Sequence, residues 1–444
     1  MEYKVKYIAQ LCDSDTDQII QEKEIKIKGL LFPKTFHEFG LRHKEQVELI
    51  KSAQDFFLEF QCNFFAEQSS CPECGKKTKK QGKFTSEFHD VYTDHRVSVQ
   101  RMACSCGWQS DHSIKSIYGS ASHPELVKLQ VKDSSETSFD KASKHLNNMC
   151  CGERKVNNHA TLINNVNKVG ALLEEIKYTD TWSCSDKIAE QIILNIDGGH
   201  VQNKEQGKHS FEELVATAYR PEDLVSISEN RKEIKCKVSV ASARQDDQKT
   251  IKELTKNACS KLGMTKETTI TALTDGASNC WPVADYLSPY CKTIYRVLDW
   301  FHIAKKFQER KTKIPVELHD KYQGSKWYLW HGKSEESLQR LEEIKLGLSG
   351  DIAIEKVNEL ISYIKNNINN VVNYKERQEN DLPFTSQLAE TSVNSVINER
   401  QKNKKMQWTR DGAHNILQIR TSIFSKNFDS EWSAIEEKMY KKAA

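Results

Sequence analysis

Three carboxylates stand where this chain could build a metal site for phosphate chemistry. Asp197 ends the apolar run IILNID before a turn expected at Gly198-Gly199, and Asp275 ends the similar run TITALTD. Glu390 lies in LAETSVNSVINER, on the edge of an apolar helical stripe. Such carboxylates suit Mg²⁺ or Mn²⁺, and two ions can clamp the attacking and leaving oxygens of a phosphodiester. We expect this triad to bind metal; the alternative is that each Asp only caps a helix or turn.

The elements that must position these residues have the pattern of buried strands. The runs LVATAYR, IKCKVSVASA and KTIYRVLD add three strand candidates to the two that deliver Asp197 and Asp275. The last run ends at Asp299, and a helical segment with His302 follows it. We expect Asp299 and His302 to hold the active site or a phosphate through hydrogen bonds, with a helix cap and a packed histidine as the alternative. The pattern predicts an α/β fold with a mixed five-stranded sheet.

Four cysteines have the spacing of a zinc site. Cys71 and Cys74 lie in CPEC, Cys104 and Cys106 lie in CSCGW, and a strand-rich stretch separates the pairs. Two close pairs joined by a hairpin can converge on one tetrahedral ion, which predicts a zinc ribbon with structural zinc. Chance burial of cysteines is the alternative. Three histidines of this region could replace one ligand: His89, His95 and His112.

Two helical regions flank the zinc pattern. Apolar residues recur at helical spacing from about Arg42 to Phe65, and we expect this amphipathic helix to pack on a neighbouring domain. Between Ser138 and Gly170, two short helical periodicities indicate a helix-turn-helix. A plain helical hairpin explains the same pattern.

Basic and aromatic residues near Glu390 are candidates for DNA contacts. Phosphates must approach a metal site, and each neutralised phosphate adds salt-dependent affinity. In KWYLWHGK, farther upstream, an exposed indole could stack on an unpaired base. Solvated charges and core tryptophans are the alternatives. The candidates are Arg400, Lys402, Lys404, Lys405, Trp408, Arg410, Lys326 and Trp327.

Composition sets the class of protein and its compartment. The 444 residues carry 65 Lys and Arg against 62 Asp and Glu, so a net charge of +3 does not by itself indicate nucleic-acid binding. The 13 cysteines suit a reducing compartment. The start MEYKVKYIAQ has charges where a signal peptide would be apolar, and no apolar run suits a membrane span. We expect a cytoplasmic protein without membrane contact, associated with the nucleoid when DNA is bound.

Four segments together resemble the DDE transposases of bacterial insertion sequences, especially the Kra-type group, and more distantly the Mutator-like transposases. They are IDGGHV, LTDGASNCW, RVLDWFHIAKKFQ and AETSVNSVINERQKNKKMQWTRDGAHNILQIRT. The resemblance implies a ribonuclease-H-like fold with a helical insertion before the last catalytic residue. It implies Asp197, Asp275 and Glu390 as ligands of two Mg²⁺ or Mn²⁺ ions. It also implies binding of terminal inverted repeats and target DNA, strand cleavage and joining, and a homodimer or larger assembly.

The expected organisation follows from these motifs. A metal-dependent DNA nuclease of the same fold, or a transposase-derived DNA-binding protein without catalysis, would share most of them. The predicted regions are N-terminal strands and a long helix (1–66), a zinc ribbon (67–115), a helix-turn-helix region (120–180), a ribonuclease-H-like core (190–310 and 384–425), a helical insertion (311–383) and a C-terminal tail (426–444).

Overall fold

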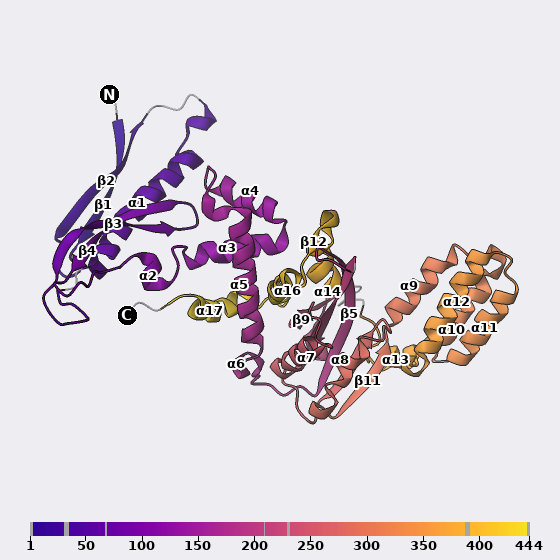
Figure 1. The fold of residues 1–444 in the computed structure, drawn as a ribbon. Helices are drawn as coiled ribbons and strands as arrows, with labels where there is room; N and C mark the ends of the chain where they lie inside the picture. The colour runs from indigo at the N-terminus through magenta and orange to yellow at the C-terminus, as the bar shows by residue number, and fades with distance from the viewer. Residues whose placement is uncertain are drawn as a thin grey trace. The chain divides into compact units, whose positions relative to one another are not determined.

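The computed structural model describes residues 3–30, 35–66, 69–207, 209–228, 231–386 and 391–441. The chain divides into two compact units. We call residues 1–166 with 431–444 the N-terminal unit, and residues 167–430 the sheet unit. Helices α5 (His159–Lys177) and α17 (Phe428–Met439) carry the chain across the two divisions (Figure 1).

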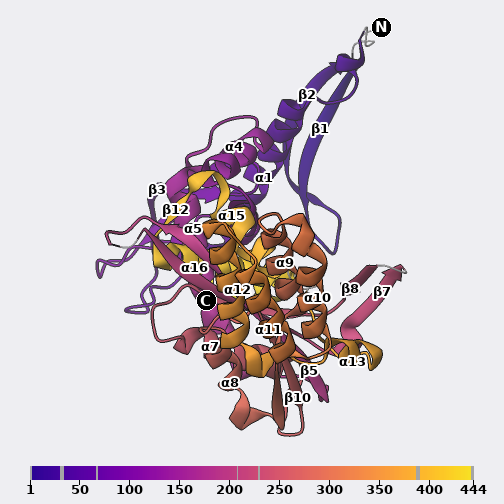
Figure 2. The same cartoon turned by 90° about the vertical axis from the view of Figure 1, so that its right-hand side faces the viewer.

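The N-terminal unit contains two antiparallel hairpins and a long helix. Strands β1 (Tyr3–Cys12) and β2 (Ile19–Leu30) form the first hairpin, which Figure 2 shows as a long ribbon. Helix α1 (His43–Ala66) packs on the second hairpin, β3 (Lys79–His89) and β4 (Asp94–Ala103). Their shared core contains Leu58 and Cys62 of α1 together with Val97 and Val99 of β4. Alternation of buried and exposed residues along β4 explains why one face of this hairpin binds the helix.

Three helices follow this hairpin. They are α2 (Ile114–Tyr118), α3 (Pro124–Glu136) and α4 (Phe139–Met149). Pro124 begins α3, and the Ser138 side chain accepts a hydrogen bond from Lys141 N at the start of α4, as expected for helix N-termini. The two periodicities predicted from sequence correspond to α4 and α5, but residues 150–158 separate them, with a short 3₁₀ helix at Lys155–Asn157. This connection is longer than a usual helix-turn-helix turn, so groove recognition stays a prediction.

The sheet unit is built on a mixed sheet with the order β11-β10-β5-β6-β9, as predicted in outline from the strand pattern. Strands β10 and β11 run parallel to the central strand β5, whereas β6 runs antiparallel to β5 and β9. Apolar runs such as IILNI are buried because helices flank the sheet. The strands are β5 (Gln191–Asn203), β6 (Ser210–Tyr219), β9 (Val238–Ser242), β10 (Thr269–Thr274) and β11 (Thr293–Leu298), and β12 (Gln407–Trp408) pairs with the end of β5.

The predicted turn at Gly198-Gly199 is wrong, because β5 continues through both glycines to Asn203. They pair with Leu214 and Glu213 of β6. A Cβ on Gly199 would lie 3.1 Å from Ile397 Cδ1, so the missing side chain lets the segment after residue 390 pack closely on the sheet. The two glycines therefore make space for packing where we had expected a turn.

Helices surround the sheet and form a separate bundle within the same unit. Helix α7 contacts β6 and β9, and α16 contacts β9. After β11, α9 leads into the bundle of α10, α11 and α12, which lie side by side in Figures 1 and 2. An apolar core with Phe307, Tyr322 and Leu360 connects them. The helices are α6 (Asp180–Ser183), α7 (Lys249–Lys261), α8 (Trp281–Asp285), α9 (Trp300–Lys311), α10 (His319–Trp330), α11 (Ser334–Leu346), α12 (Asp351–Asn366), α13 (Tyr374–Glu379), α14 (Thr391–Val393), α15 (Glu399–Gln401) and α16 (Arg410–Phe424).

The remaining described elements are short. They are the 3₁₀ helices Phe36–Glu38, Pro221–Asp223, Ser288–Tyr290, Val316–Leu318, Ile368–Asn370 and Asn403–Lys405, the π-helix Asn394–Asn398, and the hairpin of β7 (Leu224–Ser228) and β8 (Arg231–Ile234).

Candidate functional site

Three aspartates lie in one row across the three parallel strands. Thr274 of β10 pairs with Ile196 of β5 and with Leu298 of β11. The next residue along the chain is an aspartate in each case: Asp197 within β5, and Asp275 and Asp299 directly after the ends of β10 and β11. Neighbouring strands lie about 4.8 Å apart, and residues in one register row share a face of the sheet. The register therefore brings together three of the residues singled out from sequence.

All three aspartates line one small pocket. Its free volume of about 20 Å³ is enough for roughly one water-sized group or a cation. His302, one of the residues singled out from sequence, belongs to the lining, whereas the sequence pattern did not single out Asn195, Ser386 or Ser392. Asn195 precedes Asp197 by two residues, so strand alternation could have placed it on the same face. The polar lining residues are Asn195, Asp197, Thr274, Asp275, Asp299, His302, Ser386 and Ser392.

Backbone groups hold the two predicted metal ligands. Asp197 Oδ1 accepts a hydrogen bond of 2.7 Å from Gly198 N, and Asp275 Oδ1 accepts one of 2.8 Å from Ala277 N. Gly276 adopts φ +88°, and a Cβ there would lie 2.6 Å from Asn367 Oδ1. The chain therefore needs glycine directly after Asp275 to make this turn.

The electrostatics of the pocket favour a cation. Burial raises the pKa of Asp197, and the neighbouring carboxylates of Asp275 and Asp299 raise it further, while His302 and the Gly198 N–H lower it. Carboxylates that lie close together and are partly removed from water repel one another. A bound divalent cation would reduce this repulsion, and carboxylate oxygens are suitable ligands for it.

Asp299 differs from the other two because hydrogen bonds occupy its carboxylate. It is fully buried, and Oδ1 accepts 3.0 Å bonds from Phe301 N, at the start of α9, and from Ser386 N. The Ser386 hydroxyl donates to Oδ2, and His302 Nε2 lies 3.5 Å from that oxygen. Asp299 therefore caps α9 and holds the segment that leads toward residue 390. The helix cap was the alternative interpretation of Asp299 from sequence, and the structure contains it. These contacts suit a residue that positions the site.

Glu390, the predicted third ligand, lies outside the described residues. The segment that follows it covers the Asp197 face, because Ser392 Oγ accepts a 3.0 Å hydrogen bond from Thr217 Oγ1 of β6. Within the described ranges, only the four cysteines form a group of three or more Cys, His, Asp or Glu residues with ligand atoms within 4.8 Å of one another.

The four cysteines converge as predicted and could hold a structural metal ion such as zinc. Cys71 Sγ lies 3.7 Å from Cys106 Sγ, and Cys74 Sγ lies 3.5 Å from Cys104 Sγ. Four sulfurs about 2.3 Å from a tetrahedral zinc ion lie roughly 3.8 Å apart, which agrees with these separations. Each pair lies on a tight backbone turn, with Gly75 N donating to Cys71 O and Gly107 N donating to Cys104 O.

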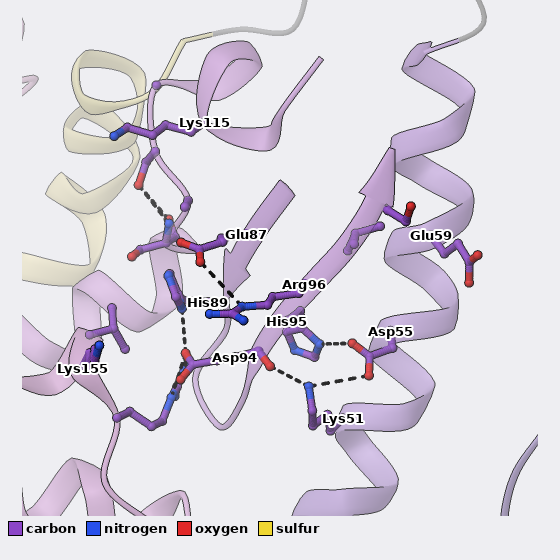
Figure 3. Close-up of a pocket in the computed structure, with 18 of the residues that line it drawn as sticks. Lys51, Asp55, Glu59, Glu87, His89, Asp94, His95, Arg96, Lys115 and Lys155 are labelled. Carbon is purple, nitrogen blue, oxygen red and sulfur yellow. Dashed lines mark hydrogen bonds and ion pairs between the residues drawn. The ribbon is translucent and has the colours of Figure 1, made fainter. Parts of the chain in front are cut away.

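The three histidines considered as zinc ligands lie elsewhere. His95 is buried, with Nδ1 2.6 Å from Asp55 Oδ1 of α1 and Nε2 3.0 Å from Asp90 Oδ2 of the β3–β4 turn. His89 pairs with Asp94, and none of the three belongs to the cysteine group. His95 therefore links α1 to the hairpin (Figure 3).

The cleft in Figure 3 has a volume of about 1270 Å³. Three ion pairs lie in its lining: Lys51 with Asp55, His89 with Asp94, and Arg96 with Glu87. Positive and negative side chains therefore alternate in the cleft, and no single sign of charge dominates these pairs.

The structure corrects two of the predicted DNA contacts. Arg400 and Trp408 are buried, with the guanidinium carbon of Arg400 4.9 Å from the centre of the Trp408 ring. The indole covers the guanidinium, and two contacts fix its place: β12 pairs with β5, and Trp408 Nε1 donates a 3.1 Å hydrogen bond to Gln401 O of α15. Lys402 and Lys405 are exposed, whereas the side chain of Lys404 lies outside the described residues.

The other candidates have mixed environments. Arg410 is partly exposed and donates a 2.9 Å bond to Ala243 O. Trp327 is half exposed, and Lys326 Nζ lies 4.9 Å from its ring centre. The neighbouring Trp330 packs on the apolar core of the helical bundle, as the alternative interpretation expected.

In comparisons with known proteins, no family model matches this chain, and no curated protein matches it at a significant level. Among the described helices, none is long and apolar enough to cross a bilayer.

Proposed function

We propose that this chain is a DNA transposase whose sheet unit has a ribonuclease-H-like fold. Numbered along the chain, the five strands have the order 3-2-1-4-5, with the first three antiparallel and the last two parallel to the first. Ribonuclease-H-like sheets have this order. The agreement supports the fold implied by the sequence resemblance.

The observation that carries the proposal is the row of aspartates across β5, β10 and β11. Asp197 and Asp275 would hold Mg²⁺ or Mn²⁺, with Glu390 as the third ligand by resemblance. When bound, the metal pair activates water or a 3′ hydroxyl and stabilises the leaving oxygen of the phosphodiester. Asp299 and His302 position the site, and Gly198 N–H and Ala277 N–H orient the two ligand carboxylates. The chain supplies no covalent nucleophile in this scheme.

Other parts of the chain would bind the DNA. The hairpin of β3 and β4 with its four cysteines suits a zinc ribbon, and the helices α3 to α5 suit recognition of terminal repeats. Exposed Lys402 and Lys405 follow the segment that begins near Glu390, where they could neutralise phosphates close to the aspartate row. Two transposon ends must be cut together, which favours an assembly of at least two copies.

Cleavage and strand transfer on the DNA that flanks the gene test the proposal. With Mg²⁺ or Mn²⁺, we expect the wild type to nick and join these ends. We expect the cleavage rate to fall at least about 100-fold in each of three variants: Asp197→Asn, Asp275→Asn and Glu390→Gln. Loss of a residue that only supports a metal ligand typically costs roughly 10- to 100-fold in activity, and loss of the ligand itself should cost more. DNA affinity should change little, since phosphate contacts are separate from metal ligands.

Asp285→Asn is the matched control, because this aspartate pairs with Arg296 away from the pocket and should be dispensable for cleavage. A ligand variant that cleaves normally would remove that residue from the site. Metal-dependent cutting without joining would identify a nuclease, and binding without either activity would identify a transposase-derived DNA-binding protein.

A further inference from the structure

Helix α12 of the bundle reaches the aspartate row with a tyrosine hydroxyl. Tyr363 Oη donates a 2.9 Å hydrogen bond to the carbonyl oxygen of Asp275. The ring of Tyr363 packs on the apolar core that the bundle shares with Leu273 of β10 and Leu298 of β11. Lys306 Nζ of α9 lies 4.5 Å from the centre of the same ring. The hydroxyl is therefore held against a residue that lines the aspartate pocket.

A second side chain at the end of α12 contacts the turn that follows Asp275. Asn367 comes directly after the helix, is 4% exposed, and donates a 3.0 Å hydrogen bond from Nδ2 to Tyr363 O. A Cβ on Gly276 would lie 2.6 Å from Asn367 Oδ1, so these two residues are in close contact. Ala277 N closes the turn by donating to Asp275 Oδ1. The end of α12 therefore contacts the two residues whose backbone sets the direction of the Asp275 carboxylate.

The Asp275 turn needs this support because it lies beyond the strand pairing. The register of β10 with β5 and β11 ends at Thr274, one residue before Asp275. Carboxylates that share a pocket repel one another, so a carboxylate outside the pairing needs another constraint to stay in the row. A metal site binds its ion more tightly when the ligands are already in place, because binding then does not have to order them. A hydrogen bond from a separate helix fixes such a turn before the ion binds.

We propose that Tyr363 is a positioning residue of the metal site: its hydroxyl fixes the main chain of Asp275, so that the carboxylate is in place before a divalent cation binds. The inference rests on the proposed function, because it concerns the same metal site. Tyr363 touches neither the ion nor the DNA in this scheme and acts only through Asp275. The helical bundle consequently supports a metal ligand besides packing on the sheet.

Hydrogen exchange of the full chain without Mg²⁺ or Mn²⁺ tests the positioning by itself. Tyr363→Phe removes only the hydroxyl, so the Ala277 N–H should exchange roughly 2- to 10-fold faster, which corresponds to the net stability of one hydrogen bond. Tyr322→Phe is the matched control, since Tyr322 of α10 donates a 3.0 Å bond to Phe307 O in the same bundle. This control should leave the exchange of Ala277 N–H unchanged. Unchanged exchange in Tyr363→Phe would overturn the proposal, and so would equal acceleration in both variants, which would show only a loosened bundle.

Mn²⁺ binding to the zinc-loaded chain, followed by electron paramagnetic resonance, connects the positioning to the metal site. We expect the wild type to bind Mn²⁺ and Asp275→Asn to lose this binding. Tyr363→Phe should raise the Kd roughly tenfold, as is usual for groups that support a metal ligand, and Tyr322→Phe should bind like the wild type.

The same titration separates the two possible failures. A wild type that binds no Mn²⁺, or an Asp275→Asn variant that binds it unchanged, would refute the proposed metal site and this inference with it. If Asp275→Asn loses Mn²⁺ while Tyr363→Phe binds it as tightly as the wild type, the inference alone is refuted. Equal weakening in Tyr322→Phe and Tyr363→Phe would also refute it, because the effect would then come from the fold of the bundle.

Discussion

At the scale of single residues, the sheet unit carries a buried acid that the proposed chemistry does not use. Glu213 is fully buried on β6 opposite Gly199, on the same face of the sheet as Asp197. Burial raises its pKa from 4.5 to about 8, although Gln401, Lys402 and Arg410 oppose the shift. Glu213 therefore keeps its proton near neutral pH.

This raised pKa predicts that the protein loses stability as the pH rises. Below about pH 4.5 both states of the protein hold the proton. Between that value and about pH 8 the unfolded chain ionises while Glu213 does not, so the free energy of unfolding falls as pH rises. Glu213→Gln should remove up to roughly 3–5 kcal/mol of this loss. Urea unfolding at about pH 5 and pH 8.5 measures it, with Glu212→Gln as the neighbouring control. Equal pH dependence in wild type and Glu213→Gln would refute the assignment.

Stability also separates a metal ligand from a positioning residue in the aspartate row. Burial and the neighbouring carboxylates raise the pKa of Asp197, so Asp197→Asn should raise the free energy of unfolding in EDTA. Asp299 accepts hydrogen bonds from Phe301 and Ser386, so Asp299→Asn should lower it by roughly 1–3 kcal/mol. Thermal unfolding with a chelator tests both. A loss of stability in both variants would mean that Asp197, too, serves the fold.

At the scale of elements, we expect the β3–β4 hairpin to depend on a metal ion held by the four cysteines. Cys71 and Cys74 precede the hairpin, and Cys104 and Cys106 follow it, so one ion would hold both ends. Cys71→Ser with Cys74→Ser should reduce bound zinc from about one ion per chain to near zero and destabilise the hairpin and α1. Metal analysis and hydrogen exchange measure these effects. Cys12→Ser with Cys151→Ser changes two exposed cysteines of the same unit, and should leave the zinc in place.

The same elements show what the sequence could and could not predict. Cysteine spacing and apolar strand runs are local signals, so they predicted the four-cysteine cluster and the mixed sheet. The continuation of β5 through Gly198-Gly199 follows from its pairing with β6, and Gly199 packs against Ile397, which lies about 200 residues further along the chain. Local glycine preferences indicated a turn instead. Burial of Arg400 under Trp408 depends on the pairing of β12 with β5, which the charge pattern does not reveal.

At the scale of the whole molecule, each of the two units contains an apolar cluster of its own. The cluster around Leu58 and Val97 belongs to the N-terminal unit, whereas the cluster around Phe307 and Leu360 belongs to the sheet unit. The four cysteines lie in the N-terminal unit alone. The aspartate row belongs to the other unit, so structural zinc and the proposed catalytic metal should stabilise different parts of the protein.

This separation predicts two unfolding transitions with different metal dependence. A zinc-selective chelator should lower the midpoint of one transition by several degrees, because binding energy at a structural zinc site is folding energy. Mg²⁺ or Mn²⁺ should raise only the midpoint of the other transition, since a ligand stabilises the unit that binds it. Calorimetry detects both shifts. Asp197→Asn is the control: it should abolish the shift caused by Mg²⁺ or Mn²⁺ and keep the shift caused by the zinc chelator. A single transition that moves as a whole with either metal would show that the units unfold together, and that the zinc stabilises the aspartate row as well as its own hairpin.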